Sequence, residues 1–177
     1  MTERPTWDNY FMSIAQQVAT RSTCLRRQIG AVVVRDKRIL ATGYNNVPSG
    51  IDHCTTRGCL RDELNIPSGE RVELCRGVHA EQNAVVQAAK YGISIDGATV
   101  YADTRPCVLC AKTMINAGIK EVVFCGEFPD DLSKAMFAEA GVIVRQMQLP
   151  PSPHTQNQEQ SYSSKHADTC CKNQDLA

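Results

Sequence analysis

The spacing of apolar and polar positions predicts alternating helices and strands along most of the chain. Apolar residues recur at helical spacing from Trp7 to Val18, with Thr6 placed to cap that helix. Two apolar runs follow at residues 29–34 and 39–44, and the short polar turn between them indicates antiparallel strands. The remaining predicted elements are a helix at 78–90, a strand at 98–102, a helix at 106–117, a strand at 121–124, a helix at 132–140 and a strand at 142–144.

This order of elements predicts the fold class. Strand–helix–strand units in the second half of the chain imply parallel strand pairs joined by right-handed crossovers. The continuous apolar run at 29–34 predicts a strand that is covered on both faces. We therefore expect residues 1–148 to form one α/β domain with three layers, α/β/α, in which helices cover both faces of a mixed five-stranded sheet.

Two segments lack such a pattern. Residues 45–76 show no regular period, and a connection of this length is unusual in a compact domain unless it is functional or held by something. Residues 149–177 contain prolines at their start and almost no aliphatic side chains, which predicts a disordered polar C-terminal tail. The tail also carries residues of metal-binding types, which we interpret as exposed side chains rather than a site: His154, His166, Cys170 and Cys171.

Composition and charge exclude several classes of protein. Of the 177 residues, 19 are Lys or Arg and 19 are Asp or Glu, so the net charge is zero and argues against non-specific nucleic-acid binding. A small phosphorylated substrate needs only one or two local cations and stays compatible with this balance. No apolar run reaches the length of a membrane span, and the N-terminus lacks the layout of a signal peptide. Nine cysteines in such a chain indicate metal or thiol chemistry in a reducing, cytoplasmic setting.

Two short motifs carry the chemistry. His79 and Glu81 form H-x-E at the start of one predicted helix, and the segment 106–110 forms P-C-x-x-C at the start of the next. A lone C-x-x-C could equally be a redox pair or half of a structural zinc site, and a lone H-x-E occurs often by chance. Both motifs in this order form the signature of zinc-dependent deaminases. The spacing therefore predicts a catalytic zinc site.

Each residue of these motifs has a specific expected role. His79, Cys107 and Cys110 would supply three ligands to Zn²⁺ and leave the fourth position for water. The two cysteines are three residues apart at a helix start, so both sulfurs face the same way, and a helix N-terminus favours thiolates. Glu81 would take a proton from the attacking water, pass it to the ring nitrogen beside the reacting carbon and then protonate the leaving amine. Taken alone, Glu81 could merely serve the helix dipole.

Longer stretches extend this signature to a family resemblance over about residues 7–148. Their order and spacing along the chain are those of one group of enzymes. The stretches are Ser22-Thr23-Cys24, Gly30-Ala31-Val32, Thr42-Gly43-Tyr44-Asn45, the segment 79–84, Pro106-Cys107 and Ala117-Gly118-Ile119-Lys120. On these residues the chain resembles the cytidine deaminase-like superfamily and, within it, the deoxycytidylate (dCMP) deaminases of bacterial and phage type. The resemblance implies a cytidine deaminase-like fold and the hydrolysis of dCMP to dUMP and ammonia, which feeds thymidylate synthesis.

The resemblance also implies substrate contacts and regulation. The residue matching Asn45 holds the deoxyribose, basic residues in the segment with Arg26 approach the phosphate, and Ala80 is expected beside the substrate. A solvated surface arginine is the alternative for Arg26. Such enzymes are often hexameric homo-oligomers, and they are often activated by dCTP and inhibited by dTTP through a turn that reads Gly-Tyr-Asn-Gly. Here Asn46 replaces the last glycine, and asparagine tolerates a positive φ less readily, which counts against this regulation.

Family members of this type carry a second zinc. The ligands implied for it include Cys24 and Cys54, and the remaining ones vary between subgroups; here Cys59 and Cys75 are available, with His53 as a rival. Four ligands and no open position would make the site structural, and the metal would tie the long irregular segment to the sheet. The alternative is that these thiols are buried or idle in a reduced protein.

Two other interpretations remain. Deaminases of the same fold act on a free base, a nucleoside or transfer RNA. The zero net charge argues against transfer RNA, and the deaminases of free nucleosides use Cys where this chain has His79. A zinc-stabilised binding module without catalysis would need zinc only for folding, and Glu81 would then be dispensable.

Overall fold

Five strands form one mixed sheet in the computed structural model, which describes residues 4–67, 69–126 and 131–148. The strand order is β2-β1-β3-β4-β5. β1 pairs antiparallel with β2 and with β3, whereas β3, β4 and β5 run parallel. The expected mixed five-stranded sheet is therefore confirmed, while the tail expected beyond residue 148 lies outside the described residues. The strands are β1 (Gly30–Arg35), β2 (Arg38–Tyr44), β3 (Thr99–Ala102), β4 (Glu121–Cys125) and β5 (Ile143–Met147).

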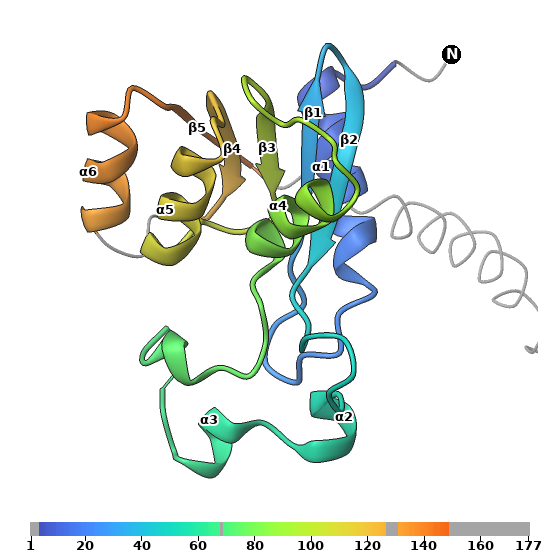
Figure 1. Cartoon of the computed structure of the whole chain (residues 1–177), viewed down its shortest axis with the longest axis vertical. Helices are drawn as coiled ribbons and strands as arrows, with labels where there is room; N and C mark the ends of the chain where they lie inside the picture. The colour runs from blue at the N-terminus through green and yellow to red at the C-terminus, as the bar shows by residue number, and fades with distance from the viewer. Residues whose placement is uncertain (1–3, 68, 127–130, 149–177) are drawn as a thin grey trace, which may run out of the picture.

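Helices cover both faces of this sheet (Figure 1). The described helices are α1 (Trp7–Ala19), α2 (Cys54–Arg57), α3 (Leu60–Glu63), α4 (Ala80–Lys90), α5 (Val108–Asn116) and α6 (Asp131–Glu139), with a short 3₁₀ turn η1 (Val72–Leu74). α1 packs on one face with Phe11 and Met12, and α4, α5 and α6 share the core on the other face. Within the described part of the chain, each helix is too short or too polar to cross a bilayer.

Strand β1, which lies between β2 and β3, serves both cores. Val32 packs in the cluster that contains α1, and its neighbour Val33 packs in the cluster that contains α4 and α5, because successive side chains of a strand point to opposite faces. Both valines are fully buried. The prediction of a strand covered on both faces is thus confirmed.

Two glycines allow helices to lie directly against these strands. A Cβ atom on Gly30 would lie 2.0 Å from the carbonyl oxygen of Ala15 in α1. A Cβ atom on Gly43 would lie 2.2 Å from the carbonyl oxygen of Ala80, at the start of α4. No side chain fits at either position, so the backbone contact between β2 and α4 fixes where α4 begins.

The helix starts differ slightly from the prediction. Thr6 caps α1 as expected, with its hydroxyl oxygen accepting from the backbone N–H of Asn9 at 3.2 Å. α4 and α5 begin later than predicted, because His79 and Cys107 are extended N-cap residues rather than helical ones. Pro106 therefore precedes the cap of α5 and does not lie in its first turn. The last strand also extends beyond its apolar run, into exposed polar positions that carry no hydrophobic signal.

Residues 47–67 and 69–77 form a lobe beyond one end of the sheet (Figure 1). Asn46 and Val78 exchange two backbone hydrogen bonds, of 3.2 and 2.8 Å, so the chain leaves and returns at one point. The lobe contains α2, α3 and η1, each a single turn or little more. The predicted lack of a regular period therefore corresponds to short helical turns rather than to a structureless loop.

Candidate active site

The N-termini of two helices converge at the predicted metal site. His79 is the N-cap residue of α4, and Cys107 is the N-cap residue of α5, with Cys110 fully buried in the first turn of α5. The backbone N–H of His79 donates to the Gln82 side chain at 3.3 Å, which fixes the first turn of α4. The positive ends of the two helix dipoles favour negatively charged ligands here, and thiolates are such ligands.

The spacing of the three donor atoms fits one zinc ion. His79 Nδ1 lies 3.4 Å from Cys107 Sγ and 3.3 Å from Cys110 Sγ, and the two sulfurs are 3.7 Å apart. A tetrahedral zinc with ordinary bond lengths requires about 3.5 Å between nitrogen and sulfur and about 3.8 Å between sulfurs. Among the residues that the structure describes, His79, Cys107 and Cys110 are the potential ligands whose donor atoms all lie within 4.8 Å of one another. We call this group the metal triad.

Glu81 lies beside the metal triad and is almost completely buried. Only 3% of its surface is exposed, and Oε2 accepts from Cys110 Sγ at 3.4 Å. Burial raises the pKa of the Glu81 carboxyl, because an apolar environment disfavours the charged form. A carboxyl group with a raised pKa holds a proton more readily than an exposed one, which suits it to move protons.

The two thiols of the metal triad differ in acidity. The side-chain hydrogen bond between Cys107 and Cys110 lowers the pKa of Cys107 to about 4. The same hydrogen bond, together with burial, raises the pKa of Cys110. One ligand is therefore already a thiolate, and a bound metal would displace the proton of the other.

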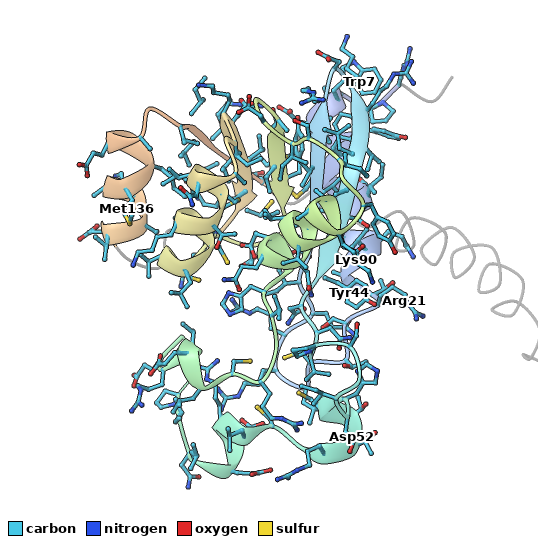
Figure 2. The ribbon with its side chains drawn as sticks, viewed as in Figure 1. Trp7, Arg21, Tyr44, Asp52, Lys90 and Met136 are labelled. Carbon is cyan, nitrogen blue, oxygen red and sulfur yellow. The ribbon has the colours of Figure 1, made fainter. Side chains whose placement is uncertain are left out.

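A cavity of about 160 Å³ adjoins the metal triad, and His79 forms part of its wall. The other walls come from the segment before β1, the end of β2 and the lobe. We call it the lobe cavity. Figure 2 shows several sulfur atoms between the lobe and the end of the sheet. Four cysteines, the cavity cysteines, line it: Cys24, Cys54, Cys59 and Cys75.

A comparison with known families decides the identity of this arrangement. Residues 5–126 match the family described as the cytidine and deoxycytidylate deaminase zinc-binding region. This chain belongs to that family. The match spans the whole metal triad and Glu81, and the description of the family names zinc as the metal that is bound.

Individual known proteins match over most of the chain. ComE operon protein 2 of Bacillus subtilis is 40% identical over 148 residues, covering 83% of this chain and 74% of that protein. Deoxycytidylate deaminase of Schizosaccharomyces pombe is 37% identical over 148 residues, covering 84% of this chain and 46% of that protein, so the chain spans about half of its length. A crystal structure of dCMP deaminase from cyanophage S-TIM5, in complex with dCMP and dUMP, superposes with a TM-score of 0.68 at 31% identity and covers 82% of this chain and 100% of its own.

Asn45, the expected sugar contact, is held by the backbone on both sides. Its Oδ1 accepts from the N–H of Ile29, and its Nδ2 donates to the carbonyl of Arg27, each at 2.8 Å. Asn45 thereby joins the end of β2 to the approach to β1, and it lines the lobe cavity. Ala80 is fully buried between His79 and Glu81. Contacts of Asn45 and Ala80 with a substrate stay predictions.

Arg26, the expected phosphate contact, anchors the lobe. Its Nε donates to Asp62 Oδ1 at 2.6 Å, and its Nη2 donates to the carbonyl of Ile66 at 2.7 Å. The side chain is 19% exposed, so Arg26 is not a solvated surface arginine. It lines the lobe cavity, and its contact with phosphate stays a prediction.

The cavity cysteines face one space but do not form a metal-binding group like the triad. Burial raises the pKa of Cys54, and the other three cavity cysteines raise it further, which places all four near one another. No three of them, within the described residues, bring their sulfurs as close together as the triad does. His53 Nδ1 instead lies 3.1 Å from Thr23 Oγ1 and 3.2 Å from Asn46 Oδ1. The ligand set of a second zinc therefore stays a prediction.

Asn46 does not adopt the positive φ that a glycine would favour. Its side-chain oxygen accepts from the hydroxyl of Thr23 at 2.6 Å, so the residue ties the end of β2 to the segment before β1. Asn46 is therefore not strained in this turn, and whether nucleotides regulate the chain stays a prediction.

Sequence reasoning missed three charged residues near the site. Burial raises the pKa of Asp103, which follows β3, from 3.8 to about 7, although its Oδ1 accepts from the N–H of Gly30 at 3.1 Å. Its place between a buried strand and the P-C-x-x-C motif was a usable signal. Arg61 and Arg76 line the lobe cavity from a segment without any periodicity, where no pattern separates them from solvated arginines.

Proposed function

We propose that this chain hydrolyses dCMP to dUMP and ammonia and thereby supplies dUMP for thymidylate synthesis. The observation that carries the proposal is the spacing of His79, Cys107 and Cys110, which suits one tetrahedral zinc, with Glu81 buried beside Cys110. The choice of substrate is supported by the S. pombe relative named deoxycytidylate deaminase and by the cyanophage enzyme in complex with dCMP and dUMP.

The residues of the site divide the chemistry among them. His79, Cys107 and Cys110 hold Zn²⁺, which when bound acts as a Lewis acid and lowers the pKa of water toward 7. Glu81 accepts the proton of the water that attacks C4 of the cytosine, and it delivers that proton to ring nitrogen N3. Glu81 then takes the proton of the hydroxyl group formed on C4 and gives it to the amine, so that the C4–N bond breaks, ammonia leaves and a carbonyl forms at C4. Its raised pKa suits both directions of transfer, which together contribute about 10² to 10⁴ in rate.

The remaining predicted contacts would orient the nucleotide. Asn45 lines the lobe cavity, and its Oδ1 has a second lone pair to offer to a sugar hydroxyl. Ala80 lies between the metal ligand His79 and Glu81, where its backbone would border the cytosine ring. Arg26 would approach the phosphate with the guanidinium nitrogen that Asp62 and Ile66 leave unused.

A second zinc bound by Cys24, Cys54, Cys59 and Cys75 is part of the proposal. The support is that all four line one cavity and that three of them raise the pKa of the fourth. A metal there would draw the sulfurs together and tie the lobe to the segment before β1. Elemental analysis of the full chain should give two zinc ions, falling to one in the Cys54→Ser variant. One zinc per wild-type chain would remove the second site.

Assembly, regulation and location complete the proposal. The family resemblance supports a cytoplasmic homo-oligomer, with a hexamer as the expected assembly, and dCTP and dTTP as activating and inhibiting effectors. Light scattering after gel filtration measures the assembly, and deaminase assays with each triphosphate measure the regulation. A monomer in solution would remove the first of these expectations, and rates that neither triphosphate alters would remove the second.

One assay tests the substrate assignment. The zinc-loaded protein is incubated with cytidine, deoxycytidine, CMP, dCMP and dCTP, and the release of ammonia is measured. We expect dCMP to have the highest kcat/KM. Preference for deoxycytidine over dCMP would overturn the nucleotide assignment, and release from none of the five would favour a binding module without catalysis.

A further inference from the structure

Three arginines of the lobe cavity have buried N–H groups without a hydrogen-bond partner among the described residues. These groups are Nη1 of Arg26, Nε of Arg61 and Nη1 of Arg76. All three side chains line the lobe cavity. A buried guanidinium N–H without an acceptor is unfavourable and uncommon in native proteins, so three beside one cavity indicate an acceptor that binds there.

The other edges of two of these guanidinium groups are already fixed. Arg26 is held by Asp62 and by the carbonyl of Ile66. Arg61 is only 8% exposed, and its Nη2 donates to the carbonyls of Pro67 and Glu70 at 2.8 and 2.5 Å. These contacts hold the guanidinium planes in place before any ligand arrives, which favours binding of a rigid, multidentate acceptor.

The charge of the cavity wall selects the class of ligand. Arg26, Arg27, Arg61 and Arg76 line the lobe cavity, and no Asp or Glu appears among the residues described as lining it. Asp62 pairs with Arg26 from outside this wall. The described part of the cavity wall therefore carries several cationic groups and no carboxylate, and it suits an anion.

The position of the cavity indicates where the anion belongs. His79, a member of the metal triad, and Asn45, at the end of β2, are part of the same wall. A molecule whose reacting group lies at the metal triad would therefore extend its remaining part toward the three arginines. A phosphate monoester carries close to two negative charges near neutral pH and three acceptor oxygens, which matches this set of donors.

We propose that Arg61 and Arg76, together with Arg26, bind the 5′-phosphate of the nucleotide substrate and set the preference for nucleotide over nucleoside. This inference rests on the proposed function and names the residues that determine its specificity. The four cavity cysteines are the competing acceptors for the same N–H groups, and the zinc content of the variants separates the two roles.

The test compares dCMP with deoxycytidine, which lacks only the phosphate. Arg76→Gln is the main variant, because within the described residues Arg76 donates no hydrogen bond to the lobe backbone, and Arg61→Gln is the second. For zinc-loaded Arg76→Gln we expect KM for dCMP to rise about 10- to 100-fold with kcat retained. The kcat/KM for deoxycytidine should stay within about threefold of wild type. Arg57→Gln is the matched control, since Arg57 belongs to the lobe but its side chain is 58% exposed.

A binding measurement without turnover gives an independent reading. dUMP should raise the melting temperature of the wild-type full chain more than deoxyuridine does, and Arg76→Gln should abolish that difference. Equal losses for dCMP and deoxycytidine, or unchanged kinetics for dCMP, would overturn the proposal. Loss of a zinc ion from Arg76→Gln with an unchanged preference for dCMP would overturn it in favour of a role beside the cavity cysteines.

Failure of the proposed function has a different signature. If wild-type protein releases no ammonia from dCMP, the proposed function fails whatever the variants do. The thermal shift with dUMP still reports on the arginines in that case. If wild type deaminates dCMP and Arg76→Gln keeps the same selectivity, the proposed function stands and the phosphate assignment fails.

Discussion

Two sets of thiols lie near His79, and the molecule holds them in different ways. Cys107 is the N-cap residue of α5, a helix that packs on the sheet, Cys110 lies in its first turn, and their sulfurs are 3.7 Å apart. The four cavity cysteines come from single-turn helices, their flanks and the segment before β1, and their sulfurs share a cavity without grouping. A helix that packs on the core therefore holds its metal ligands close together before a metal binds. The cavity cysteines of the lobe and the segment before β1 would have to move closer together to bind one.

The largest expected effect concerns Glu81, which lies beside the metal triad. Glu81→Gln should lower kcat for dCMP by about 10² to 10⁴ while zinc content and melting temperature stay close to wild type. Steady-state assays with elemental analysis measure both. Glu139→Gln, on the exposed surface of α6, is the control. Turnover that survives in Glu81→Gln would indicate that the metal triad is structural.

The next effect tests how far the helices depend on close contact with the sheet. Gly43→Ala and Gly30→Ala should each destabilise the fold by about 3 kcal/mol, because a Cβ atom would overlap the backbone of α4 or α1. Only Gly43→Ala displaces the start of α4, so only this variant should also weaken zinc binding. Urea unfolding and competition with a zinc chelator measure the two quantities. Equal zinc affinity in both variants would contradict the inference that the contact between β2 and α4 positions the metal triad.

A pH effect is expected from Asp103, which lies next to β1. Burial raises its folded-state pKa from 3.8 to about 7, so between these values the folded protein binds a proton more tightly than the unfolded chain. Stability should therefore fall as the pH rises through this window. Asp103→Asn should gain about 2 kcal/mol over wild type at pH 8 and little at pH 4. Urea unfolding at the two pH values measures this gain, and a pH-independent difference would contradict the buried-charge explanation.

The smallest expected effect lies in the lobe. Asp62→Asn removes the charge that holds Arg26, in a pair whose carboxylate is 55% exposed. Amide exchange in α3 should become severalfold faster, with no measurable change in global unfolding, because the lobe contributes little to the two cores. Hydrogen exchange followed by mass spectrometry measures this. Faster exchange in β1 and β3 as well would mean that the lobe and the sheet unfold as one unit.

The same contrast explains what could be predicted from the sequence. The burial of Val32 and Val33 could be predicted, because an unbroken apolar run is typical of a strand that is covered on both faces. The metal triad could also be predicted, because His79, Cys107 and Cys110 stand at the starts of two helices that the pattern indicates. The helix boundaries were less accurate, because His79 and Cys107 act as caps and apolar spacing carries no information about caps. The burial of Arg61 and Arg76 could not be predicted, because burial in an irregular lobe depends on tertiary contacts that no local sequence period encodes.

The double membership of His79 has a thermodynamic consequence. One imidazole belongs both to the metal triad and to the wall of the lobe cavity. Any occupant of the cavity that shifts this ring changes the zinc affinity by some factor, and linkage requires zinc to change the affinity for that occupant by the same factor. Titrating zinc with and without a saturating nucleotide would thus yield a single coupling free energy, readable from either ligand.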